Sequence, residues 1–311
     1  MNNKEKFSYS NLMIGNEVAK ALQDGLPVVA METGYLAHRE EGRDHVKDAL
    51  ECVECIRKNG AVPAVVAIFG GKLRVGLEQE ELKAFLQRDD LVKCNMRDLC
   101  VAIYNRSYGT TTISATVHAA ALAGISIVAA GGIGGVHRGV QKSYDISPDL
   151  DSIAGYPGIV ICSGAKSILD IPLTIEYLET KGVTVVGYNT NEFPAYYVRE
   201  SDLPLEHICH TPKEAAALLK SKQTIGDTSG MIIANPIRKE AAQDKQAVED
   251  AIANALQKAE KQKIQGKGIT LFLLNEVEKQ IGKSIVDSSF YIKRDNAELA
   301  AKIAVALYEL Q

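Results

Sequence analysis

Residues 125–139 read ISIVAAGGIGGVHRG and combine a strand pattern with a cluster of glycines. The first six residues form a short apolar run with β-branched side chains, which is typical of a buried strand. Four glycines follow within five residues, at the point where the backbone leaves the predicted sheet. Glycine permits a tight turn or a close approach to a ligand. We therefore predict a strand that ends at a ligand-binding loop, with a turn needed only for packing as the alternative.

The alternation of short β-branched runs with longer helical patterns recurs along the chain and favours an α/β fold, a mostly parallel sheet with helices on both faces. We predict strands at residues 28–32, 64–69, 125–130, 158–162, 183–187 and 231–234. We predict helices at residues 16–23, 45–58, 110–123, 173–181 and about 240–261, and a further helix after Thr211. Phe69-Gly70-Gly71-Lys72 is typical of a hairpin turn, so the sheet should be mixed.

Composition limits the domain organisation and the classes of partner. No Gly/Ser/Pro linker divides the 311 residues, so we expect one domain over residues 1–311, with a helical C-terminal third from about residue 236. The chain has 35 basic and 39 acidic residues, a net charge of −4, and no basic block, which argues against nucleic acid as a partner. No apolar run approaches the ~20 residues of a membrane helix. Six scattered cysteines and a polar N-terminus favour reduced thiols and a cytoplasmic location.

The segment after the glycines carries groups suited to an anion and a cation. His137 and Arg138 can donate hydrogen bonds to a phosphate. Asp145 and Asp149 lie four residues apart in a polar segment, and hard carboxylate oxygens near a phosphate favour a Mg²⁺- or Mn²⁺-type ion. The alternative is that both aspartates are helix caps or turn formers.

Lys166 stands just after the predicted strand at residues 158–162. Ligands of open α/β sheets collect at the carboxyl ends of strands. An amine held there among apolar groups would have its charged form disfavoured and could attack carbon. The alternative is a lysine that simply reaches solvent.

Two other segments could contribute to a site. Glu32 closes an apolar strand and is followed by a turn, a position suited to acid or base catalysis. Lys93 and the hydroxyl row Gly109-Thr110-Thr111-Thr112 suggest a second anion site at a helix N-terminus. Each could equally be a surface charge or a helix cap.

Taken together and in this order, these segments resemble the pseudouridine-5′-phosphate glycosidase family, also called indigoidine-synthase-A-like proteins. The resemblance runs from about Leu12 to Leu307. It is carried by GGIGGVHRG, DIS at 145–147, SGAKSILDIPLTIEYLETKGV at 163–183, GY at 187–188, EFPA at 192–195, ANPI at 234–237 and NAELAA at 296–301. The resemblance implies a three-layer α/β/α fold that assembles as homo-oligomers, commonly trimers.

The same resemblance implies roles for individual residues. Lys166 would be the covalent nucleophile, Glu32 the proton donor, and Asp145 the ligand of Mn²⁺. Contacts with a small-molecule substrate are implied for Lys93, Thr112, Ile113, His137, Arg138, Ser147, Pro148, Asp149 and Asn296. The implied reaction cleaves pseudouridine 5′-phosphate reversibly to uracil and ribose 5-phosphate. Lysine suits a carbon–carbon bond because an amine both attacks carbon and, as an iminium, accepts the departing electron pair.

The sequence departs from the family pattern directly after Glu32. Family members usually continue Ser-Thr-Ile-Ile-Ala-His-Gly with a proline-containing segment, whereas this chain reads TGYLAHREEG at residues 33–42. Lys93 is followed by Cys-Asn-Met-Arg, where a serine and two arginines are common. The base is therefore left open. The alternatives are cleavage of another C-ribosyl phosphate, a C-glycoside synthase or aldolase-like enzyme with the same lysine chemistry, and a non-catalytic sugar-phosphate binding protein.

Overall fold

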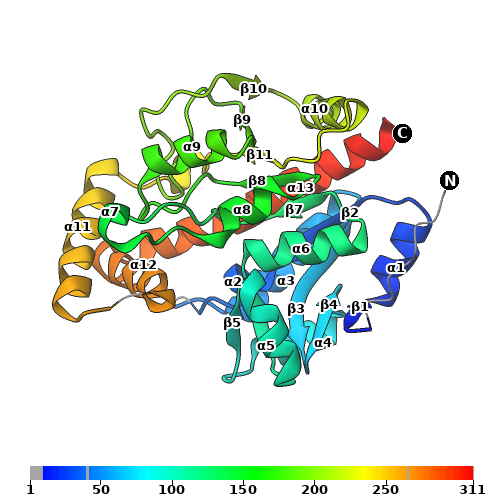
Figure 1. Cartoon of the computed structure of the whole chain (residues 1–311), viewed down its shortest axis with the longest axis horizontal. Helices are drawn as coiled ribbons and strands as arrows, with labels where there is room; N and C mark the ends of the chain where they lie inside the picture. The colour runs from blue at the N-terminus through cyan, green and yellow to red at the C-terminus, as the bar shows by residue number, and fades with distance from the viewer. Residues whose placement is uncertain (1–9, 40–41, 265, 311) are drawn as a thin grey trace.

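The runs predicted as strands lie side by side in one twisted sheet (Figure 1). The computed structural model describes residues 10–39, 42–264 and 266–310. Within them the sheet order is β1-β4-β3-β2-β7-β8-β11-β9-β10. The strands are β1 Leu12–Ile14, β2 Val28–Glu32, β3 Val62–Phe69, β4 Lys72–Val75, β5 Val92–Cys94, β6 Gly109–Thr111, β7 Ile127–Ala129, β8 Ile159–Cys162, β9 Thr184–Tyr188, β10 His207–Cys209 and β11 Met231–Ala234.

The mixed character of the sheet is confirmed. β4 pairs antiparallel with β3 across the predicted hairpin, where Phe69 faces Lys72, and β6 also runs antiparallel to β3. The central pairs β2–β3, β2–β7, β7–β8 and β8–β11 are parallel. The parallel part of the sheet therefore brings the carboxyl ends of β2, β7, β8 and β11 to one edge.

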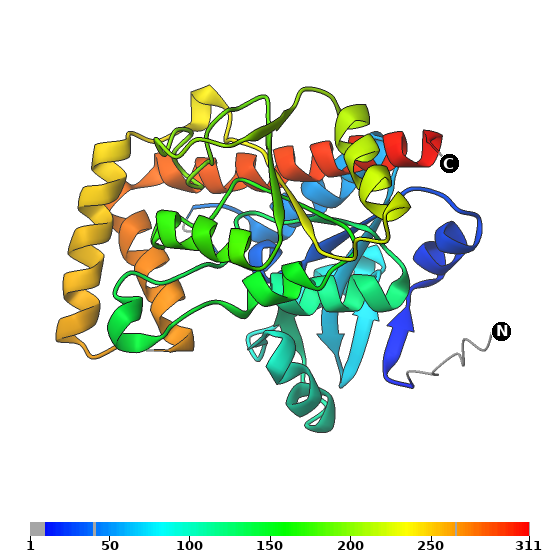
Figure 2. The ribbon, with the colours of Figure 1, turned by 45° about the horizontal axis from the view of Figure 1, so that its top comes forward.

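Helices cover both faces of the sheet, so the three-layer α/β/α arrangement is confirmed (Figures 1 and 2). One face packs against α1 Asn16–Gln23, α6 Ile113–Ala123, α8 Pro148–Ala154 and α9 Ile171–Thr180, and the other against α3 His45–Lys58, α4 Gln79–Leu86, α10 Pro212–Thr224 and α13 Lys283–Glu309. Side chains alternate between the two cores along each strand, as the pleat requires. In β2, for example, Ala30 lies in the first core and Met31 in the second.

The C-terminal third is helical. α11 Lys245–Lys261 packs beside α12 Lys267–Ile281, and α13 runs along one face of the sheet (Figure 1). The remaining short helices are α2 Thr33–Leu36, α5 Leu99–Tyr104, α7 Val140–Ser143 and the 3-10 turns η1 Met96–Asp98 and η2 Lys239–Ala241. None of the helices in the described part of the chain is long and apolar enough to cross a membrane.

Two predicted helices begin later than the sequence pattern suggested. The helix predicted from residue 110 begins at Ile113, because the preceding residues form β6 and pair with β3. The helix predicted from about residue 240 starts only after Asp244, whose carboxylate accepts a hydrogen bond from the Ala247 N–H at 2.8 Å. In both places tertiary pairing or a cap decides the boundary, which helical periodicity alone does not show.

The strand order reverses between β2 and β7. From β2 the chain continues to β3 and β4 on one side, whereas from β7 it continues to β8 and then to β9 beyond β11 on the other. In open α/β sheets, ligands bind outside the carboxyl ends of the strands at such a switch point. Glu32 and the loop at residues 130–139 both follow strands that flank it.

Candidate active site

Glu32 ends β2 and is buried at the switch point, with 5% of its surface exposed. Burial raises the pKa of its carboxyl to about 8; the positive charges of Lys166 and Lys93 and a hydrogen bond from the Gly131 N–H oppose the rise, and the Asp149 charge adds to it. At neutral pH the carboxyl is therefore protonated and can donate a proton. The same interactions place both lysines within electrostatic reach of Glu32.

Lys166 is held at this edge by a continuation of the β7–β8 pairing. Beyond the strands Ile133 forms a parallel bridge with Ala165, and the Lys166 N–H donates to the Ile133 carbonyl at 3.1 Å. The side chain is half-buried. The structure thus brings the two residues expected to be catalytic, Lys166 and Glu32, to the same edge of the sheet, after β8 and at the end of β2, the two strands that flank β7. Their catalytic roles remain predictions.

The glycines of the loop after β7 leave room for side chains from other parts of the protein, which pack directly against the loop backbone. A Cβ on Gly132 would lie 2.9 Å from Cε2 of Tyr196, and one on Gly134 would lie 2.7 Å from Oδ2 of Asp149. A Cβ on Gly135 would meet the Thr174 hydroxyl. Close packing therefore requires these glycines, and the loop also supplies the Gly131 N–H to Glu32.

Asp149 fixes the glycine loop to the start of α6. Its Oδ2 accepts from the Gly134 N–H at 3.0 Å, and its Oδ1 accepts from the Ser114 N–H at 2.9 Å. A carboxylate is stabilised in the first turn of a helix by the exposed amides and the helix dipole. Asp149 itself thus occupies the anion site that the hydroxyl row predicted. Backbone amides engage both of its carboxylate oxygens, and its contact with substrate remains a prediction.

His137 and Asp145 lie together on the loop that α7 interrupts. The His137 N–H donates to the Asp145 carbonyl at 3.0 Å. Burial lowers the pKa of His137; the Asp145 charge opposes this shift, while Lys166 and Lys93 add to it. The imidazole is therefore neutral at neutral pH. The charges of Lys166 and Lys93 act on His137 as well as on Glu32.

Asp145 suits a hard divalent cation only if other ligands come from outside the protein. Among residues 10–39, 42–264 and 266–310, no group of three or more His, Cys, Asp or Glu side chains gathers as a metal site. With Asp149 engaged by backbone amides, Asp145 would be the single carboxylate ligand. Mg²⁺ and Mn²⁺ tolerate this because they retain waters and bind phosphate oxygens. Manganese remains a prediction.

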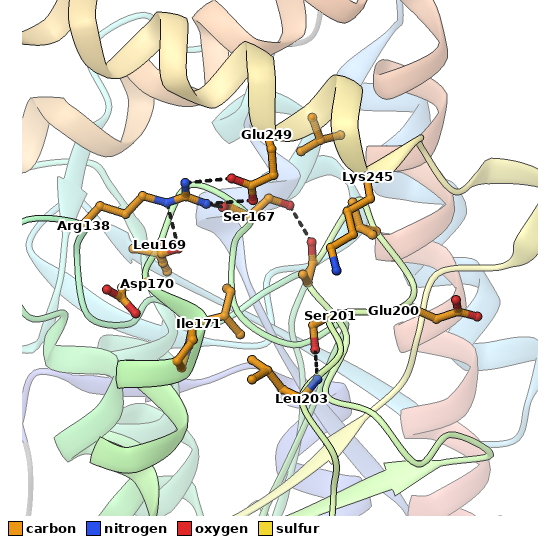
Figure 3. Close-up of a pocket in the computed structure, with 14 residues that line it drawn as sticks. Arg138, Ser167, Leu169, Asp170, Ile171, Glu200, Ser201, Leu203, Lys245 and Glu249 are labelled. Atoms are coloured by element: carbon orange, nitrogen blue, oxygen red, sulfur yellow. Dashed lines mark hydrogen bonds and ion pairs between the residues drawn. The ribbon is translucent and has the colours of Figure 1, made fainter.

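Arg138 has partners other than the phosphate or base expected for it. Its Nε donates to the Leu169 carbonyl and its Nη2 to the Ser167 carbonyl, each at 3.2 Å (Figure 3). Its Nη1 and Nη2 also donate to the two carboxylate oxygens of Glu249 on α11, at 2.8 and 2.9 Å. In this structure Arg138 is thus a clamp that joins α11 to the loop directly after Lys166.

A cavity of about 320 Å³ lies beside this clamp (Figure 3). It is lined by Arg138, Ser167, Leu169 and residues of α9, α11 and the loop before β10, and neither Glu32 nor Lys166 contributes to it. This cavity is therefore separate from the cluster at the switch point.

Asn296 holds strand ends together from α13. It is fully buried, and its Nδ2 donates to the carbonyls of Ala130 at 2.8 Å and Gly131 at 3.1 Å. Its Oδ1 accepts from the Asn235 side chain at 2.9 Å, just after β11. Asn296 therefore positions the backbone that supplies the Gly131 N–H, and direct contact with substrate remains a prediction.

The other residues with implied substrate contacts lie in three places. Thr112 is the N-cap residue of α6 and Ile113, its first residue, is fully buried. Ser147 caps α8 and accepts from the Asp149 N–H at 3.2 Å, and Pro148 is the first residue of that helix. Lys93 is exposed on β5.

Sequence reasoning did not single out two tyrosines at the site. Tyr196 packs against Gly132, has a positive φ of 62°, and donates its N–H to the Ser163 carbonyl at 2.9 Å. Tyr35 follows Glu32 by three residues, and its hydroxyl is within electrostatic reach of the Glu32 carboxyl and of Tyr196. The change of sequence after Glu32 was the one signal that pointed to Tyr35.

Comparisons with known proteins agree on one family. The family model for indigoidine synthase A-like proteins matches residues 17–306. A protein of Caldanaerobacter subterraneus named pseudouridine-5′-phosphate glycosidase is 42% identical over 96% of this chain and 97% of its own length. One of the same name from Staphylococcus aureus is 43% identical over 94% and 96%.

Two solved structures share the fold. The prealnumycin C-glycosynthase AlnA, solved in complex with ribulose 5-phosphate, is 33% identical with a TM-score of 0.89, covering 96% of this chain and 98% of its own. An indigoidine synthase A-like protein of Thermotoga maritima is 28% identical with a TM-score of 0.85, covering 96% of both chains.

Proposed function

This chain belongs to the family of indigoidine synthase A-like proteins, and we propose that it cleaves pseudouridine 5′-phosphate reversibly to uracil and ribose 5-phosphate. The observation that carries the proposal is that a protonated carboxyl, Glu32, lies within electrostatic reach of Lys166 at the switch point of the sheet. Relatives that bear the name of this activity and align over nearly the whole chain support it.

The proposed reaction uses the two groups on the two carbons of the bond that breaks, Lys166 on C1′ and Glu32 on C5. Opening of the ribose ring breaks the C1′–O4′ bond, whose electron pair stays on O4′. The Lys166 nitrogen, as the neutral amine, then bonds to C1′, and a proton of that nitrogen passes to O4′. Glu32 gives its proton to C5 of uracil. The nitrogen lone pair forms a C=N bond as the C1′–C5 bond breaks, and the electron pair of that bond returns to the uracil ring. Water hydrolyses the imine, which releases ribose 5-phosphate, restores the amine and returns a proton to Glu32.

Other residues would bind and orient the substrate. Lys93 would attract the phosphate through its charge, and the neutral His137 would form a hydrogen bond with it. Both interact electrostatically with groups of the site, Lys93 with Glu32 and His137 with Asp145 and Lys166. A Mn²⁺ ion bound by Asp145 would supply positive charge to the phosphate and water ligands. The Arg138 clamp would position Lys166 by holding the backbone of Ser167 and Leu169, which directly follows it.

Release of uracil from pseudouridine 5′-phosphate by the pure protein with Mn²⁺ tests the proposal. We expect turnover by the wild type and none above background by Lys166→Ala. A wild-type protein that leaves every C-ribosyl 5-phosphate intact would refute it.

A C-glycoside synthase is the second candidate, because the chain has the same fold as a protein named a C-glycosynthase. Incubation with ribose 5-phosphate and a panel of aromatic acceptors separates the two. The glycosidase proposal predicts that uracil is the preferred acceptor, whereas a synthase would prefer another ring. Adduct formation on Lys166 in either case would argue against a non-catalytic sugar-phosphate binding protein.

We also propose that the protein acts as a homotrimer in the cytoplasm, following the family resemblance. Light scattering after size-exclusion chromatography tests the assembly. A mass three times that of the chain is expected, and a monomer at micromolar concentration would contradict it.

A further inference from the structure

Tyr35 lies on α2, the single helical turn that begins directly after Glu32. Its side chain is nine-tenths buried and packs into the core on the α3 side of the sheet. Of the described residues, Tyr35 carries the one buried side-chain polar atom that lacks a hydrogen-bond partner, its hydroxyl. Buried polar groups in native proteins nearly always have a partner, so a lone hydroxyl beside an active site indicates a partner supplied by a ligand.

The surroundings of this hydroxyl identify it as a donor. Burial raises the pKa of Tyr35 well above its ordinary value, and Cys52, Glu32 and Tyr196 add to the rise. The phenol therefore keeps its proton at any pH at which the protein works. It can offer an O–H to an acceptor that enters near Glu32.

The charges nearby favour a neutral acceptor over a phosphate. The cationic side chains of the site, Lys93 and Lys166, act on Glu32 and His137, and neither is among the groups that shift Tyr35. A phosphate would bind where those cations lie. The end of the substrate that reaches Glu32 in the proposed reaction is instead the uracil ring, whose C4 carbonyl adjoins the C5 carbon that receives the proton.

We propose that the Tyr35 hydroxyl recognises the base, donating a hydrogen bond to the C4 carbonyl oxygen of uracil beside the Glu32 carboxyl. This assignment rests on the proposed function. It makes Tyr35 a specificity-determining residue for bases that carry a carbonyl group next to the reacting carbon. It also gives a purpose to the altered segment after Glu32.

Tyr35→Phe tests the assignment because it removes the hydroxyl and keeps the ring. In the condensation of uracil with ribose 5-phosphate, we expect kcat/KM for uracil to fall on the order of tenfold or more, as for loss of one polar contact with a substrate. Borohydride trapping of ribose 5-phosphate on Lys166, measured without any base, should match the wild type. The melting temperature should not fall, because no hydrogen bond within the protein is lost.

Tyr156→Phe is the matched control. Tyr156 is also fully buried, but its hydroxyl donates to the Ile125 carbonyl at 2.8 Å, away from the site. The control should lower the melting temperature, since it leaves that carbonyl unpaired, and should leave kcat/KM for uracil within about twofold of the wild type.

Three results would overturn the assignment. The first is Tyr35→Phe with wild-type kcat/KM for uracil, and the second is an equal loss of trapping and of uracil use, which would indicate a structural role. The third is a wild type that traps ribose 5-phosphate but accepts no base with such a carbonyl. A wild type that neither traps the sugar nor cleaves the nucleotide would instead refute the proposed function, and the assignment of Tyr35 with it.

Discussion

Among the single residues, Glu32 carries a carboxyl that keeps its proton, as the proposed chemistry requires. The positive charges of Lys166 and Lys93 offset the burial of Glu32 only in part, so the loss of hydration dominates and raises its pKa to about 8. A sequence places a glutamate at a strand end but does not show how dry that end is. The residue could be selected from the sequence, whereas its protonation state required the packed structure.

The raised pKa of Glu32 predicts how stability and activity depend on pH. Between pH 4.5, the ordinary value, and about pH 8 the folded state binds more protons at Glu32 than the unfolded state, so this residue lowers stability as pH rises through that range. Thermal denaturation should show that wild type loses stability from pH 6 to 9 relative to Glu32→Gln, which cannot ionise. The kcat/KM for cleavage should fall above about pH 8, where the proton donor is lost.

If the stability of wild type and of Glu32→Gln changed with pH to the same extent, Glu32 would be ionised over the whole range and its pKa would not be raised. Cleavage that still rises beyond pH 9 would show that another group supplies the proton.

The glycine loop predicts a steric effect at Gly134. Gly134→Ala would place a Cβ against Ser147 and 2.7 Å from Asp149 Oδ2, which should cost about 1–3 kcal/mol in unfolding free energy, as overpacking does, and should lower kcat. Gly155→Ala on the nearby α8 is the control, since its Cβ would have 3.8 Å to the nearest atom. Urea denaturation compares the two. Equal stability of both variants would contradict the packing described here.

At the scale of elements, α11 acts on the site through Arg138 and Glu249. Glu249→Gln removes a charge from the clamp while keeping its size, so the Ser167–Leu169 loop should loosen. We expect kcat and the rate of imine trapping to fall about tenfold, with little change in the melting temperature because the pair is partly exposed. Steady-state and single-turnover kinetics would measure the effect.

Lys245→Ala is the matched control for the clamp. Lys245 lies on the same helix and lines the same cavity (Figure 3), but its partner is the exposed Asp202. Its kinetics should equal those of the wild type. If both variants behave alike, the clamp does not position Lys166.

The elements also show which features a sequence reveals. The strand at residues 231–234 and the helices at residues 16–23 and 45–58 were predicted with the observed boundaries, because each has its own apolar period and stop signal. The helix predicted from residue 110 was wrong in its first turn, since strand pairing with β3 takes those residues. Asp149 bonds to Ser114, 35 residues away, and Arg138 bonds to Glu249, 111 residues away, so no local pattern could reveal these contacts.

In the molecule as a whole, the candidate site lies where the strand order reverses between β2 and β7. Helix α13 packs across β2, β7 and β8 at this point. Asn296 of α13 bonds to the residues directly after β7, and a ligand bound there would contact segments from distant parts of the chain. Binding should therefore stabilise the entire fold. The alternation of strands and helices predicted this architecture, but the position of α13 against the sheet required the structure.

Ligand-linked stability measures this coupling. Ribose 5-phosphate at 100 times its dissociation constant should add about 2.7 kcal/mol to the unfolding free energy, and Mn²⁺ should add a further increment. Asp145→Asn should lose the metal increment and keep most of the sugar increment. Melting curves with and without chelator report both. A metal increment unchanged in Asp145→Asn would place the cation elsewhere.

The proposed reaction requires the Lys166 amine to form an imine with ring-opened ribose 5-phosphate. Borohydride reduces such an imine, so the wild-type protein is reduced with ribose 5-phosphate and its peptides are analysed by mass spectrometry. We predict one reduced sugar-phosphate adduct per chain, located on Lys166, and none in Lys166→Arg. An adduct on another lysine, or no adduct in a protein that still cleaves pseudouridine 5′-phosphate, would refute this role of Lys166.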